Sequence, residues 1–192
     1  DGIFNEGDQV LFYGEGPVTW YYDTNKEMFR HTIHAYSYYS YYYLTSSLGA
    51  GKNISPAPTP SGNPTNNINT YDYYLYHEKN LYNLLKSGAQ WYGENFGISG
   101  NLALKMKIPD LVKDQNLKIF SSFRSRSSEN STSFTLSVNS QPVQEVNIPG
   151  LGSKSFNNYA GTYVLAGNAL DQFNVSSENL SIIISYDKNG FP

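Results

Sequence analysis

The sequence predicts a mainly β protein, in which an aromatic-rich irregular β segment with one α-helix is followed by an antiparallel β-sandwich of jelly-roll-like kind. Apolar and polar residues alternate over short runs from residue 101 onward, with Ser, Asn and Gly between the runs. The 192 residues include 18 tyrosines and 10 phenylalanines, which favour strands. One stretch, residues 74–87, has the apolar spacing of a helix.

Four short runs in the first half are rich in strand-forming residues and end at turn formers. They lie at residues 9–13, 19–22, 29–33 and 38–45. Within residues 29–33 the side chains alternate between two faces, as they do along a strand.

A long loop and a helix are expected next. Residues 55–69 carry four prolines and four asparagines among Ser, Thr and Gly, which predicts an exposed loop. In residues 74–87, leucines and tyrosines recur at spacings of three, four and seven, as on one face of a helix. Gly88 lies where a left-handed residue would end that helix, and Lys86 suits the negative end of its dipole.

The second half has a regular strand pattern. Strands are expected at residues 102–108, 117–123, 133–139, 143–148, 162–165 and 180–186. In the third of these, Phe134, Leu136 and Val138 face one way. Short strands at this spacing predict a sandwich. We therefore divide the chain into a Tyr-rich β segment, residues 1–100, and a β-sandwich, residues 101–192.

Composition excludes several classes of function. Lys and Arg number 13 against 16 Asp and Glu, a net charge of −3 without a basic block, so we expect no nucleic-acid partner. No apolar run approaches the roughly 20 residues of a membrane span. The chain contains no cysteine, which excludes disulfides, thiolate catalysis and zinc–thiolate sites. With its many Asn, Ser and Tyr residues, this composition indicates an exported bacterial surface protein.

The N-terminal segment has the form D-G-x-x-N-x-x-D, with oxygen-bearing side chains every three or four residues around glycines. Short loops of this kind wrap Ca²⁺, which takes six to eight oxygen ligands. The candidate ligands are Asp1, Asn5 and Asp8, too few to surround the ion alone. An acidic turn before a strand is the competing interpretation, and we favour it.

Six of the eight residues 36–43 are tyrosines. Exposed rings would offer faces for stacking on sugars, whereas buried rings would fill the core or a domain interface. Alternation along a strand sends these rings to both faces, so at least one set is expected to be filler, the interpretation we favour. The candidate interaction surface consists of Trp20, Tyr38, Tyr42 and Trp91.

Other polar groups give weaker signals. The imidazoles are His31, His34 and His77, and the first two point to opposite faces of a strand, which disfavours a shared metal. No G-x-S-x-G nucleophile motif occurs. Residues 87–94 place a Trp-Tyr pair between two glycines after the expected helix, which predicts a tight turn with Glu94 available to backbone amides.

Distinctive strings run through the first half: DGIF at 1–4, LFYG at 11–14, WYY at 20–22, YYYLT at 41–45 and WYGE at 91–94. Together they resemble the region ahead of the catalytic domain in type IX secretion sortases. These are surface signal peptidases of the gingipain-like (C25) cysteine peptidase family in Bacteroidetes. The resemblance covers essentially the whole chain, being specific in the first half and compatible in the second.

The resemblance implies a parent enzyme that removes the C-terminal sorting domain of secreted cargo and can attach the cargo to surface lipopolysaccharide. The family's catalytic Cys and His lie downstream of this region, and no catalytic residue carries over to a chain without cysteine. The implied role is a scaffold or interaction domain for the downstream peptidase domain, cargo or outer-membrane secretion components. The implied location is the bacterial outer-membrane surface, and we expect the sandwich to lack a closing strand after Pro192.

Two other functions remain open. A carbohydrate-binding module would expose two or three coplanar aromatic rings in a groove, whereas the scaffold role predicts that most of residues 36–43 and Trp91 are buried. A hydrolase would need two carboxylates facing each other, at roughly 5–9.5 Å for a glycosidase.

Overall fold

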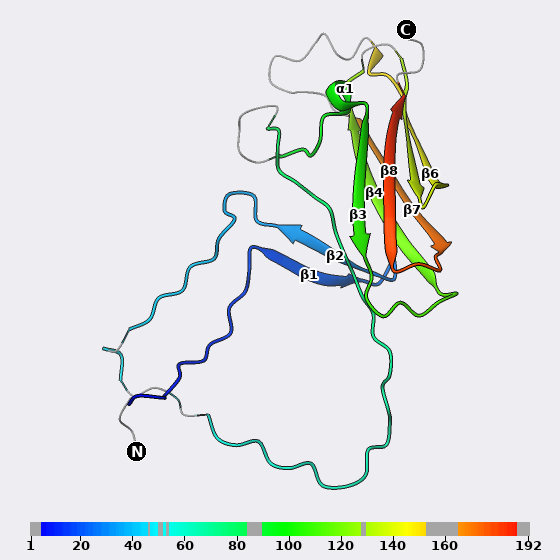
Figure 1. Ribbon diagram of the computed structural model, residues 1–192. Helices are drawn as coiled ribbons and strands as arrows, with labels where there is room; N and C mark the ends of the chain where they lie inside the picture. The colour runs from blue at the N-terminus through cyan, green and yellow to red at the C-terminus, as the bar shows by residue number, and fades with distance from the viewer. Residues whose placement is uncertain are drawn as a thin grey trace. The chain divides into compact units, whose positions relative to one another are not determined.

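The computed structural model describes residues 5–45, 47–49, 52, 54–83, 90–127, 130–152 and 165–187. Contacts divide the chain into two compact units, Asp1–Tyr74 and Leu75–Pro192, and each is described by itself. The regular structure of the described residues consists of eight strands and one helix of four residues (Figure 1). The prediction of a mainly β fold is confirmed.

The first unit contains a β-hairpin. Strand β1 (Val18–Asp23) pairs antiparallel with β2 (Met28–Ile33), as expected for residues 19–22 and 29–33. The Asp23 carboxylate accepts hydrogen bonds from the backbone N–H groups of Asn25 and Lys26, at 3.1 and 3.2 Å. An Asp side chain that bonds its own turn in this way stabilises the reversal of the chain.

Aromatic rings cover one face of this hairpin. Trp20 lies 5.0 Å from the His31 ring and 4.3 Å from Tyr74, measured between ring centroids. Phe29 lies 4.7 Å from the same Tyr74 ring and 5.4 Å from Tyr22. These tilted and edge-on arrangements are the ones that aromatic pairs prefer.

Two strand predictions in the first unit are wrong. Residues 9–13 and 38–45 are exposed and lie in no strand. A β-prone sequence forms a strand only where a neighbouring strand accepts its hydrogen bonds and packs against its side chains. Residues 55–69 are exposed and have no helix or strand.

The predicted helix over residues 74–87 is also wrong. Residues 74–83 are not helical, and residues 84–89, with Lys86 and Gly88, lie outside the described part of the chain. The N–H groups of Leu81 and Tyr82 donate to the Tyr92 carbonyl at 2.9 and 3.0 Å, and Tyr92 N–H donates to the Tyr82 carbonyl at 2.8 Å. Leu81 and Tyr82 therefore bond to a distant segment instead of to residues four positions earlier, as a helix requires. Within the described residues the helix is α1 (Phe96–Ser99).

The second unit is an antiparallel sandwich. Its strands are β3 (Asn101–Lys107), β4 (Asn116–Ser125), β5 (Thr132–Val138), β6 (Gln141–Ile148), β7 (Leu165–Asn174) and β8 (Asn179–Asp187). One sheet has the order β3-β8-β5-β6 and the other pairs β4 with β7. The pairs β5–β6, β4–β7 and β3–β8 are nested, as in a long hairpin rolled up on itself (Figure 1). Such pairing is jelly-roll-like.

Strand β7 is much longer than the strand expected at residues 162–165. Residues 162–164 lie outside the described part, and β7 continues from Leu165 to Asn174. Its whole length pairs with β4, from Leu165 opposite Ser125 to Asn174 opposite Asn116. The alternation along β7 is weak because Gly167 and Ala169 carry little or no side chain.

The core lies between the two sheets in two clusters. The buried members are Leu136, Val138, Val175, Leu180 and Ile182 in one, and Phe123, Phe134, Val146 and Ile148 in the other. Phe123 of β4 and Phe134 of β5 stack with centroids 4.4 Å apart and planes 7° apart. Gln144 Nε2 donates to the Ile119 carbonyl at 3.0 Å, which joins β6 to β4 across the layers.

The β5–β6 turn contains two residues with left-handed backbones. Asn139 has a φ of 49° and Ser140 a φ of 69°. Two positive φ angles are what the tightest hairpin turns require. Asn139 also bonds to β8, since its side-chain Oδ1 accepts from the Ser181 N–H at 2.8 Å.

Candidate functional site

The tyrosines of residues 36–43 are exposed. Their exposed fractions run from 50% at Tyr42 to 95% at Tyr43, and Trp91 is 39% exposed. The prediction that these rings fill the core is therefore wrong, and their place at a domain interface stays a prediction. Without a strand over residues 38–45, no alternation directs half of the rings inward.

The four residues predicted as an interaction surface have different surroundings. Trp20 is partly buried against His31 and Tyr74. Tyr42 packs on Phe12 at 5.5 Å, and its hydroxyl bonds to the backbone carbonyl and N–H of Glu15. Tyr38 is 66% exposed in the same unit, and Trp91 lies in the other unit.

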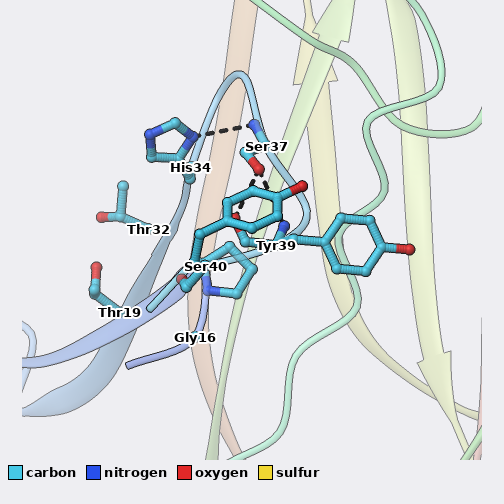
Figure 2. A pocket seen from close by; sticks show the side chains of 9 residues that line it. Gly16, Thr19, Thr32, His34, Ser37, Tyr39 and Ser40 are labelled. Carbon is cyan, nitrogen blue, oxygen red and sulfur yellow. Dashed lines mark hydrogen bonds between the residues drawn. The ribbon is translucent and has the colours of Figure 1, made fainter. Parts of the chain in front are cut away.

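A pocket of about 420 Å³ lies on the first unit, and we call it the hairpin pocket. Its lining residues are Gly16, Pro17, Thr19, Thr32, His34, Ser37, Tyr39, Ser40 and Tyr41. Thr19 and Thr32 are directly opposite each other on β1 and β2. Figure 2 shows these threonines on the hairpin strands, beside Ser37, Tyr39 and Ser40 of the segment that follows.

That following segment is held by side-chain hydrogen bonds. His34 Nδ1 accepts from the N–H groups of Tyr36 and Ser37 at 3.2 and 3.1 Å. Ser37 Oγ donates to the Tyr39 carbonyl at 2.7 Å and accepts from the Tyr39 N–H at 3.1 Å (Figure 2). Because Nδ1 of His34 is an acceptor, the proton of the neutral ring is on Nε2. Sequence reasoning missed this pocket, since no motif marks it.

Glu94 is paired within the second unit. His77 Nε2–H donates to Glu94 Oε1 at 2.8 Å, and Lys79 Nζ lies 3.6 Å from the same oxygen. Partial burial raises the pKa of Glu94, but the hydrogen bond from His77 and the charges of His77 and Lys79 lower it below its ordinary value. These contacts join residues 77–79 to the segment that carries Trp91.

The predicted calcium loop is described in part. Asp1 lies outside the described residues, so the three-ligand set stays a prediction. Asp8 Oδ2 accepts from the Asn5 N–H at 2.7 Å, and the Asp8 N–H donates to the Asn5 carbonyl at 3.1 Å. One carboxylate oxygen is thus bonded to the backbone of its own turn. In the described part of the chain, no three His, Asp or Glu side chains gather in a group that could hold a metal ion.

Comparisons with known proteins include a likeness to a solved structure. No family model and no curated protein matches the chain. The crystal structure of dimeric latent PorU from Porphyromonas gingivalis is similar over 92% of this chain, with a TM-score of 0.64 and 25% sequence identity. The matched part is 17% of the PorU chain.

No helix among the described residues is long and apolar enough to cross a bilayer.

The likeness to PorU agrees with the resemblance of the sequence strings to the type IX secretion sortases. The comparison supports a link at the level of the family between this chain and PorU.

Proposed function

We propose that the chain is the non-catalytic N-terminal interaction domain of a surface gingipain-like (C25) peptidase of the type IX secretion system. The observation that carries this proposal is the likeness to PorU over 92% of the chain, which leaves most of PorU outside the match. In this role the chain holds the downstream peptidase domain of the same polypeptide, cargo or an outer-membrane secretion component. The chemistry belongs to the downstream domain, because the sequence here contains no thiol nucleophile.

The exposed tyrosines go against a pure scaffold, for which most of residues 36–43 and Trp91 would be buried, and they fit the interaction role instead. Five rings in residues 36–43 are at least 66% exposed, and they lie on a segment without regular secondary structure. Contiguous exposed apolar surface marks interaction sites, and tyrosine is enriched at protein interfaces. In this proposal the downstream peptidase domain covers Tyr36, Tyr38 and Tyr43, which lie outside the hairpin pocket, while the sandwich, with its own core, supports the assembly.

Binding between separately prepared parts tests the proposal. The 192-residue chain is titrated with the remaining peptidase portion of the parent protein in an isothermal calorimeter. We expect saturable binding, weakened about tenfold by Tyr38→Ala if the ring packs in the interface. Val112→Ala, at an exposed position of the sandwich unit, is the matched control and leaves the affinity unchanged. Absence of any binding contradicts the proposal.

A second measurement addresses catalysis. We expect the chain alone to leave peptide substrates intact. Turnover by the isolated chain that disappears when a single acid or imidazole is replaced would overturn the proposal.

The alternative function, a carbohydrate-binding module, is favoured by the exposure of the tyrosine rings. Of the residues that the sequence singled out for it, Trp20 and Tyr42 are engaged within the first unit. These two rings therefore have only part of their surface available to a sugar. A sugar site in this unit is better placed elsewhere.

A further inference from the structure

The hairpin pocket has the size of a small-ligand site. Its volume of about 420 Å³ falls within the range of roughly 300–1,000 Å³ that such sites occupy. All its lining residues belong to the first unit, so the pocket depends on no contact between units. The paired Thr19 and Thr32 lie on neighbouring strands, and strands are better supports for a site than loops.

The opposite part of the lining is ordered by the bonds already described. His34 Nδ1 holds the backbone of Tyr36 and Ser37, and Ser37 Oγ holds that of Tyr39. The rings of Tyr39 and Tyr41 are 71% and 74% exposed. The pocket thus presents two exposed rings, and the backbone of one of them, Tyr39, is held by the Ser37 side chain.

The chemistry of the lining selects a class of ligand. Thr19, Thr32 and Ser40 supply aliphatic hydroxyls, which both donate and accept hydrogen bonds, whereas the Ser37 hydroxyl is already bonded to the Tyr39 backbone. The lining contains no carboxylate, ammonium or guanidinium group, so it offers no counter-charge to an ionic ligand. Hydroxyl groups beside aromatic faces suit a ligand that carries many hydroxyls and an apolar ring face.

We infer that the hairpin pocket binds a neutral sugar, with Tyr39 or Tyr41 against the ring face of the sugar and the threonine and serine hydroxyls bonded to its hydroxyls. This inference goes beyond the proposed function and involves residues other than the aromatic set predicted from the sequence. It requires no peptidase partner, since the pocket is complete within the first unit.

The test uses the full 192-residue chain and saturation-transfer NMR with mannose, galactose, N-acetylglucosamine and maltose as probes. We expect saturation transfer to at least one sugar, with an affinity that titration then measures. Tyr41→Ala is expected to weaken binding about tenfold, and Tyr41→Phe, which keeps the ring, to weaken it much less. Thr32→Val removes a hydroxyl at nearly constant side-chain shape and is expected to lower the affinity for the sugar about three- to tenfold.

Tyr43→Ala is the matched control, because this ring is 95% exposed and lies outside the pocket. Its affinity for the sugar should equal that of the unaltered chain. The inference is overturned if none of the four sugars receives saturation. It is equally overturned if the pocket variants bind as well as Tyr43→Ala does. Thr32→Val should still bind the peptidase portion, which separates failure of this inference from failure of the proposed function.

Discussion

Gly167 of β7 lies directly against the side chains of β6, in the other layer of the sandwich. A Cβ atom at this residue would lie 2.6 Å from Val146 Cγ1, 2.6 Å from Ile148 Cγ1 and 2.8 Å from Ile148 Cδ1. Carbon atoms in contact are about 3.5–4.0 Å apart, so alanine would overlap β6 by about 0.9 Å. Ile148 has no exposed surface and Val146 only 6%, which leaves neither side chain space to move away.

We expect Gly167→Ala to destabilise the sandwich by about 1–3 kcal/mol, the usual cost of overpacking a core. Gly167 is not among the glycines with a positive φ, so backbone strain adds nothing to this cost. Urea denaturation followed by circular dichroism measures the loss. Ala166→Val, on the exposed neighbouring residue of β7, is the control and should change the midpoint little.

A double mutant tests the cause. Val146→Ala removes one of the overlapping methyl groups, so Gly167→Ala should cost less in that background, with a coupling energy of at least about 0.5 kcal/mol. If Gly167→Ala leaves the denaturation midpoint unchanged, or if the two substitutions are additive, the close approach of β7 to β6 is refuted.

The pairing of Glu94 with His77 stabilises the fold above about pH 4.5, the ordinary pKa of a glutamate, and this contribution is lost as the pH falls through the lowered pKa of Glu94. Glu94→Gln should therefore cost about 1 kcal/mol at neutral pH and nothing in acid, and a cost that is the same at both pH values in urea denaturation would contradict the pairing. Ser140→Gly should stabilise the fold by up to about 1 kcal/mol and so raise the melting temperature, because glycine adopts a φ of 69° without strain. A lower melting temperature would argue against the left-handed backbone at residue 140. Phe134→Ala should cost about 3–5 kcal/mol in calorimetric unfolding, since this ring is 3% exposed, and a cost below 1 kcal/mol would place it outside the core.

The sandwich could be predicted because the alternation of apolar and polar residues along a strand shows which face of that strand is buried. The pattern predicts one shared face for Phe134, Leu136 and Val138, and all three are buried with 2–3% of their surface exposed. The same reasoning located the hairpin strands at residues 19–22 and 29–33. Where small residues weaken the pattern, as at Gly167 and Ala169, most of a ten-residue strand was missed.

The failures share a physical cause. Residues 38–45 have strand-forming side chains but no strand. Residues 74–87 have the spacing of leucines and tyrosines expected of a helix, but the described part, residues 74–83, is not helical. The propensity of a segment predicts the secondary structure that it adopts in the absence of tertiary contacts, and such contacts can override it. Near Tyr82, the backbone of Tyr92 supplies the partners that a helix would have found within itself.

By itself, the sequence determined that the chain is mainly β, that its second half forms a sandwich, and that no thiol is available for catalysis. These properties follow from composition and from the alternation within each segment, and neither depends on which segments meet in the fold. The tertiary structure alone decided the nested strand pairs, the contact between Gly167 and β6, the pairing of His77 with Glu94, and the hairpin pocket. Each of these joins residues that are far apart along the chain, and their proximity depends on which backbone groups find one another as the chain folds.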